Sequence, residues 1–116
     1  MARRGHRWFA AVYDLLNRSA ERRLLGPIRA RLLGALRGRV LEVGAGTGAS
    51  FPDYAPEPVG PIVVATDPDP FMLRRAVARA RQARQSGRRI RLVQCAAEAL
   101  PFRDRTFDTV VAAMVL

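Results

Sequence analysis

The sequence predicts an α/β fold: a doubly wound parallel sheet preceded by a helical cover. Four short apolar runs, each typical of a strand, alternate along the chain with loops or amphipathic segments. Alternation of this kind favours parallel strands joined by right-handed crossovers. The first run, Val40–Val43, opens into a loop with glycine at every second position, a pattern that indicates a nucleotide-type βα unit.

The chain before the first strand is predicted to be helical. Residues 7–37 show apolar residues at helical spacing, interrupted near Gly26, and Gly38 ends the pattern. The apolar residues expected to share a face in its second part are Ile28, Leu32, Leu33 and Leu36. We therefore divide the chain into a helical cover, residues 1–37, and an α/β domain, residues 38–116.

The segment after the glycine loop leads to a second strand. Ala49–Tyr54 can form only a short helix, because prolines and a glycine follow it. The apolar run Ile62–Thr66 predicts the strand, and Asp67 ends it. Asp69 is then a suitable helix N-cap, and the proline that follows suits the first helical position.

A longer helix is predicted from Phe71 to about Gln85, where a serine and a glycine end it. Its buried residues are expected to be Leu73, Ala76, Val77 and Ala80. Its arginines are expected to form a solvated face: Arg74, Arg75, Arg79, Arg81 and Arg84. Two further strands are predicted at Ile90–Val93 and Thr109–Val115, and the second is continuously apolar, as a buried parallel strand should be.

The glycine loop and an acid after the second strand indicate a ligand that contains a ribose. Gly44, Gly46 and Gly48 let the backbone lie against a ligand that a Cβ would block. Gly44, Gly46 and Ala49 also satisfy the dinucleotide pattern, so the glycines leave the ligand open. Asp67 stands 23 residues after Gly44, where an acid can accept hydrogen bonds from ribose hydroxyls. Both NAD and S-adenosylmethionine carry such a ribose.

A third segment favours S-adenosylmethionine. It comprises A-E-A-L-P-F at 97–102, Asp104 and F-D-T-V-V at 107–111. Together with V-L-E-V-G-A-G-T-G at 40–48 and D-P-D-P-F-M-L at 67–73, it strongly resembles the class I S-adenosylmethionine-dependent methyltransferases. The nearest likeness is to the small-molecule and lipid or quinone branch of that family. The resemblance implies a Rossmann-like sheet, and S-adenosyl-L-methionine as the cofactor.

The resemblance also implies an incomplete sheet. That family has seven strands, and only four are present here, so we expect the N-terminal half of the fold, truncated after the fourth strand. An uncovered parallel sheet exposes apolar faces and unpaired backbone groups. The isolated chain is therefore expected to aggregate or form a molten species rather than to melt as a cooperative monomer.

The resemblance assigns a role to each segment of the site. The expected cofactor-binding residues are Glu42, Gly44, Ala45, Gly46, Gly48, Asp67, Pro68, Met72, Ala97 and Glu98. Glu42 is expected to hold the cofactor's amino group, since a buried acid without a partner would be costly. Met72, with Phe71, is expected either to form an apolar wall for the adenine or to pack in the core. The family's usual acid is replaced by Ala96, and Asp108 is expected at the sheet edge near the cofactor.

Composition limits the remaining possibilities. The chain has 116 residues and a formal net charge of +10, and all 20 of its basic residues are arginine. Nucleic-acid binding is disfavoured, because there is no zinc-finger spacing and no basic strand interleaved with aromatic residues. One cysteine, Cys95, favours a reducing compartment, and no apolar run is long enough to span a membrane. We expect a cytoplasmic protein whose basic N-terminal helix is able to contact an anionic membrane surface.

The sequence thus predicts transfer of a methyl group from S-adenosyl-L-methionine to a small-molecule or lipid acceptor. No metal site is expected, and no catalytic residue can be named, because substrate groups in this fold come mostly from segments after the fourth strand. Two alternatives stay open. One is a fragment of an NAD(P)-binding oxidoreductase, and the other is a non-catalytic truncated half-domain that binds the cofactor.

Overall fold

The computed structural model describes residues 30–103 and 105–112. Its strands are β1 (Arg39–Val43), β2 (Ile62–Asp67), β3 (Arg89–Gln94) and β4 (Thr109–Ala112). Its helices are α3 (Pro70–Gln85), two short 3-10 turns, η2 (Phe51–Asp53) and η3 (Ala97–Ala99), and a helical segment over residues 30–35. The predicted helix before residue 30, Asp104 and the end of the predicted fourth strand lie outside the described residues.

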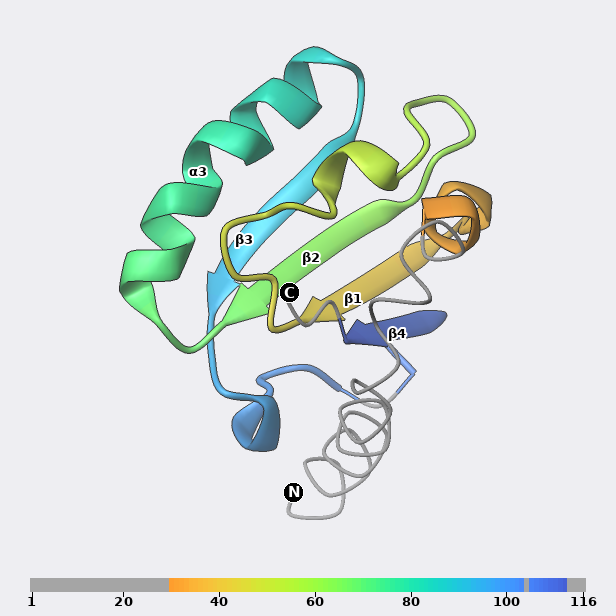
Figure 1. Cartoon of the computed structure of the whole chain (residues 1–116). Coiled ribbons are helices and arrows are strands. Elements are labelled where there is room, and N and C mark those ends of the chain that lie inside the picture. Colours follow the sequence, from red (N-terminus) through yellow and green to blue (C-terminus); the bar gives the residue numbers. More distant parts are fainter. Residues whose placement is uncertain (1–29, 104, 113–116) are drawn as a thin grey trace.

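The four strands form one parallel sheet in the order β3-β2-β1-β4 (Figure 1). Val43 at the end of β1 pairs with Thr66 of β2 and with Ala112 of β4, and Asp67 pairs with Gln94 of β3. The carboxyl ends of all four strands therefore meet at one edge of the sheet. The predicted α/β fold class with a parallel, Rossmann-like sheet is confirmed.

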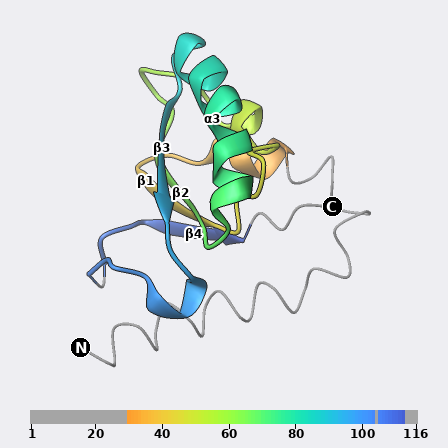
Figure 2. The ribbon, with the colours of Figure 1, turned by 90° about the vertical axis from the view of Figure 1, so that its left-hand side faces the viewer.

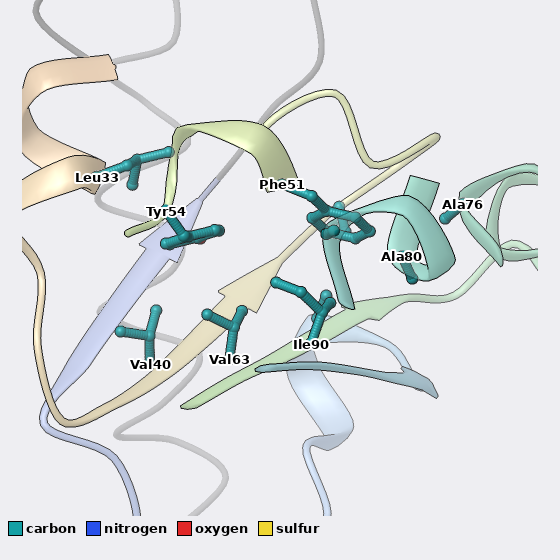
Figure 3. Close-up of a cluster of buried hydrophobic side chains, with 11 residues drawn as sticks. Leu33, Val40, Phe51, Tyr54, Val63, Ala76, Ala80 and Ile90 are labelled. Carbon is teal, nitrogen blue, oxygen red and sulfur yellow. The ribbon is translucent and has the colours of Figure 1, made fainter. Parts of the chain in front are cut away.

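One face of the sheet carries the larger hydrophobic core. Helix α3 and η2 lie on the same side of the sheet (Figure 2). Phe51 and Tyr54, both almost fully buried, point from η2 and its C-terminal end towards the strands (Figure 3). Members of this cluster come from every layer: Leu33, Val40, Ala45, Phe51, Tyr54, Val63, Ala65, Ala76, Ala80, Ala83 and Ile90. Burial of these side chains fixes α3 and η2 against β1, β2 and β3.

The opposite face is packed by the chain between β3 and β4. Leu41 and Val43 of β1 are buried there together with Leu100. Phe102 and Phe107 meet edge to face, with ring centroids 5.1 Å apart and an interplanar angle of 88°. The quadrupoles of aromatic rings favour this geometry. The contact joins two parts of the chain between β3 and β4.

Helix α3 begins and ends where the sequence predicts. The Asp69 side chain accepts a hydrogen bond from the Phe71 backbone N–H at 2.9 Å, and Pro70 opens the helix. After Gln85, Gly87 adopts a φ of +87°, which turns the chain towards β3. The predicted buried face is partly wrong, since Val77 is 40% exposed and Ala83 is buried in its place. The orientation of α3 on β2 and β3 determines which of its side chains are buried.

Three further expectations need correction. Leu32 is 62% exposed, so it does not share the buried face of Leu33. The described residues of β4 are only half-buried, because β4 lies at one edge of the described sheet with β1 on its other side. Asp108 lies at the amino ends of the strands, where its carboxylate accepts from the Arg39 N–H at 2.9 Å. Asp108 therefore joins β1 to β4 at the edge opposite the one expected.

Candidate functional site

The glycine loop forms a tight turn at the carboxyl end of β1. Gly44, Gly46 and Gly48 all have positive φ, at +72°, +58° and +82°. A Cβ on Gly48 would lie 2.6 Å from the ring of Phe51, so any larger residue there would collide with the core. The Ala45 N–H donates to the carbonyl oxygen of Thr66 at 2.9 Å, which fixes the loop beside β2. The turn thus has the backbone conformation that only glycine adopts readily, and the predicted contact of this backbone with a ligand stays a prediction.

Asp67 connects the tip of β2 to the glycine loop. One carboxylate oxygen accepts from the Gly46 N–H at 2.9 Å, and the other accepts from the Asp69 N–H at 2.9 Å. The residue is 9% exposed. A carboxylate oxygen can accept more than one hydrogen bond, so both oxygens retain capacity for ligand hydroxyls. The sequence predicted the ligand-binding role of Asp67 but not its hydrogen bond to the loop.

Glu42 is fully buried, and two hydroxyl groups satisfy its carboxylate. Ser50 donates to one oxygen at 2.7 Å, and the Tyr54 hydroxyl donates to the other. A structural role for Glu42 is therefore well supported, because the buried carboxyl group has hydrogen-bond partners. Ser50 and Tyr54 are site residues that the sequence analysis missed. Their only sequence signal is that they are hydroxyl residues shortly after the loop.

The residues proposed as an apolar wall lie on the surface. Phe71 is 67% exposed and Met72 is 38% exposed, while Pro68 is also exposed. The Arg74 guanidinium lies 5.1 Å from the centroid of the Phe71 ring. The alternative that Phe71 and Met72 belong to the core is therefore wrong. These two residues therefore leave apolar surface exposed in the first turn of α3.

The chain that leads into the third predicted segment runs beside Asp67. The Cys95 N–H donates to the carbonyl oxygen of Asp67 at 3.2 Å, and the Gln94 side chain donates to the carbonyl oxygen of Pro68 at 3.2 Å. The chain then enters η3, where Ala97 packs against the core cluster and Glu98 is exposed. The sheet edge thus assembles the loop after β1, the end of β2 and the start of η3.

The thiol at this edge is held neutral. Burial raises the pKa of Cys95, and a hydrogen bond with the Thr66 side chain offsets part of that rise. Thiolate, rather than thiol, is the reactive form. Cys95 therefore does not provide a nucleophile at neutral pH, in agreement with the absence of a basic residue next to it in the sequence.

The described residues show neither a metal-binding cluster nor a membrane-spanning helix. Within residues 30–103 and 105–112, no three His, Cys, Asp or Glu side chains gather closely enough to bind a metal ion. Among the described helices, none combines the length and the apolar character that crossing a membrane requires.

Comparisons with known proteins agree with this geometry. Residues 40–116 match a family model described as a methyltransferase domain. Uncharacterized protein Rv1405c from Mycobacterium tuberculosis is 41% identical over 92 residues, which are 78% of this chain and 31% of that protein. The chain thus spans about a third of the length of the curated relatives it matches.

Solved structures share the fold. The structure of PH0226 from Pyrococcus horikoshii is similar with a TM-score of 0.56 and 30% identity, over 78% of this chain and 38% of that one. An S-adenosylmethionine-dependent methyltransferase from Clostridium acetobutylicum is similar with a TM-score of 0.52 and 22% identity, over 90% and 42% of the two chains.

Proposed function

Because the chain belongs to the methyltransferase domain family, we propose that it binds S-adenosyl-L-methionine at the carboxyl edge of its sheet. We propose further that the protein transfers the cofactor's methyl group. The family membership confirms the resemblance to class I S-adenosylmethionine-dependent methyltransferases and implies their cofactor. It favours this function over the NAD(P)-dependent oxidoreductase that the glycine pattern also allowed.

The observation that carries the proposal is the placement of Asp67. Its carboxylate lies at the end of β2, next to a turn of positive-φ glycines, and retains acceptor capacity after accepting two backbone N–H groups. A pair of neighbouring ribose hydroxyls fits such an acceptor. The exposed Phe71 and Met72 follow on the same side and would cover the adenine.

The other residues have supporting roles in this proposal. The backbone of Gly44, Ala45, Gly46 and Gly48 would contact the methionine part of the cofactor. Glu42 would hold the cofactor's amino group through a bridging water molecule, because its own carboxylate is fully buried. Ala97 and Glu98 would edge the adenine, and backbone groups would replace the acid that is missing at Ala96.

Little acid–base chemistry is required of these residues. When bound, S-adenosyl-L-methionine supplies a methyl group activated by a sulfonium. The chain's own residues hold and orient the ligand and exclude water from it, so their contribution is mainly one of proximity and alignment. A general base is needed only for an acceptor that arrives protonated, and we assign none of the described residues to that role.

We propose a small molecule or a lipid as the methyl acceptor, met in the cytoplasm or at the membrane surface. The resemblance to the lipid and quinone branch supports this class, and so does the basic character of the predicted N-terminal helix, which lies outside the described residues. Nucleic acid is not proposed as a partner. Binding of the chain to anionic vesicles distinguishes a lipid acceptor at a membrane from a soluble one.

The Asp67→Ala substitution tests cofactor binding. It should weaken binding of S-adenosyl-L-methionine by about 1.5–3 kcal/mol, the usual loss for hydrogen bonds to a charged group. Isothermal titration calorimetry of the full chain measures the change. Asp69→Ala is the matched control, since it removes a neighbouring carboxylate that only caps α3. That control should lower stability while leaving the affinity close to that of the unsubstituted chain.

Two results would count against the proposal. If the unsubstituted chain failed to bind S-adenosyl-L-methionine but bound NADH, the oxidoreductase alternative would replace it. If Asp67→Ala and Asp69→Ala had equal affinities, the ribose assignment would be wrong, even with the cofactor correctly identified.

A further inference from the structure

We propose that Arg79 is a positioning residue for the cofactor loop, an inference that rests on the proposed function. One terminal nitrogen of its guanidinium donates to the Thr47 hydroxyl at 2.8 Å and to the Thr47 carbonyl oxygen at 3.3 Å. Thr47 stands between two glycines at the tip of the loop after β1. A side chain from α3 thus contacts the tip of the glycine loop.

The other hydrogen bonds of the loop come from β2 and from the loop itself. Ala45 is hydrogen-bonded to Thr66, and Gly46 to the carboxylate of Asp67, so β2 fixes the first half of the loop. The second half is tied by the hydrogen bond from the Gly48 N–H to the Ala45 carbonyl oxygen at 3.0 Å. Arg79 adds a contact between the loop tip and α3. Together these bonds join the loop to both elements of the βα unit that follows.

Arg79 differs in this respect from its neighbours on α3. Arg74 lies over the Phe71 ring, and Arg84 donates to the carbonyl oxygen of Ile90 at 2.9 Å. Arg75 is exposed and forms no hydrogen bond to the described part of the chain. The sequence analysis placed all of these arginines in one solvated face. Arg79 is exposed as expected, but unlike Arg74, Arg75 and Arg84 it contacts the glycine loop through Thr47.

The contact matters because a glycine-rich loop loses much conformational freedom when it becomes ordered. If the loop is already ordered before the ligand binds, less of the binding free energy is lost in ordering it. Arg79 therefore raises cofactor affinity without touching the cofactor. An arginine suits this role better than a lysine, since its planar guanidinium is pre-organised and loses less conformational freedom for each hydrogen bond formed.

The experiment compares Arg79→Ala with Arg75→Ala in the full chain, using calorimetric titration with S-adenosyl-L-methionine. We expect Arg79→Ala to weaken binding by about threefold to tenfold, the range for an exposed hydrogen bond, and Arg75→Ala to change it less than twofold. Both variants remove one exposed positive charge from the same helix. Arg79→Lys, which keeps the charge, should bind with intermediate affinity.

A double-substitution cycle identifies the partner. In the Thr47→Ala background, Arg79→Ala should weaken binding less than in the unsubstituted chain, because the hydroxyl acceptor is already gone. Thr47→Ser keeps the hydroxyl and should preserve the full effect. Hydrogen exchange of the Gly46 and Gly48 amides, measured without ligand, should be faster in Arg79→Ala than in Arg75→Ala.

The outcomes separate this inference from the function on which it rests. If the unsubstituted chain does not bind the cofactor, the proposed function is wrong and the inference with it. If the chain binds but Arg79→Ala and Arg75→Ala have the same affinity, only the inference is overturned. A purely structural role would lower the melting temperature of Arg79→Ala without a change in affinity or in loop exchange, and that result would also overturn it.

Discussion

At the residue scale, the candidate site contains two buried carboxyl groups that accept hydrogen bonds from within the chain. Glu42 is fully buried and accepts from two hydroxyl groups, and Asp67 accepts from two backbone N–H groups. A carboxyl group buried without hydrogen-bond partners would cost several kcal/mol, so these hydrogen bonds stabilise the fold around the loop. Ser50 and Tyr54 thus contribute to the site through Glu42.

The Tyr54→Phe substitution tests the network around Glu42. It removes the hydroxyl but keeps the ring in the core, so the expected loss is that of one hydrogen bond to a buried charge. We expect the free energy of unfolding to fall by about 1–3 kcal/mol, measured by urea denaturation. The Arg88 side chain donates a hydrogen bond to the backbone carbonyl oxygen of Tyr54, and this bond should persist because it does not involve the tyrosine side chain.

Ser50→Ala provides the comparison, because it removes the second hydroxyl donor from the same carboxylate. The two substitutions share one partner, so the combined effect should differ from the sum of the single effects. Equal stability of Tyr54→Phe and the unsubstituted chain would show that the Tyr54 hydroxyl does not stabilise Glu42.

At the element scale, helix α3 shows which features follow from local chemistry. Asp69, Pro70 and Gly87 mark its boundaries in the sequence, and the structure places all three as predicted. Caps and helix stops depend on the backbone of a few neighbouring residues, which is why they were predictable. The exposure of Val77 was not, because the angle at which a helix packs on a sheet depends on residues far away in the sequence.

Gly87→Ala tests the end of α3. The residue has a φ of +87°, and its Cβ would meet Pro56 at an ordinary distance of 3.4 Å, so backbone strain is the main cost. We expect a loss of about 1–2 kcal/mol in the free energy of unfolding. Thermal denaturation followed by circular dichroism measures it.

Gly34→Ala is the matched control for that substitution. Gly34 lies in the helical segment over residues 30–35, and a Cβ there would come no closer than 3.5 Å to the Asp53 carbonyl oxygen. Alanine favours a helix over glycine by up to about 1 kcal/mol, so the control should be neutral or stabilising. A destabilisation equal to that of Gly87→Ala would contradict the strain argument.

At the scale of the whole molecule, charge and sheet edges are the main features. The formal net charge is +10, and several arginines form hydrogen bonds to the backbone of the fold. Arg84, Arg88 and Arg89 donate to the backbone carbonyl oxygens of Ile90, Tyr54 and Gly60, respectively. In the described sheet, β3 and β4 are the edge strands. The expected tendency of the isolated chain to aggregate stays a prediction, and a cooperative two-state transition of the monomer in the urea and thermal experiments would contradict it.

Vesicle binding tests the proposed lipid acceptor. The full chain should bind vesicles of mixed anionic and zwitterionic lipid at low salt, and binding should weaken as salt shortens the screening length to about 3 Å at 1 M. The paired change Arg22→Gln and Arg23→Gln should reduce binding more than Arg74→Gln with Arg75→Gln. Absence of binding, or equal reduction by the two pairs, would contradict membrane contact through the predicted N-terminal helix.

The sequence by itself determined the order of the strands along the chain, the glycine turn, the acid at the end of β2 and the caps of α3. These features follow from short-range rules of backbone geometry and from the alternation of apolar and polar segments. Only the tertiary structure decided the partners of Glu42, the contact between Arg79 and Thr47, and the position of Asp108. Such contacts join residues that are 8 to 69 positions apart. They depend on how α3, η2 and the sheet pack, and no local pattern in the sequence encodes that packing.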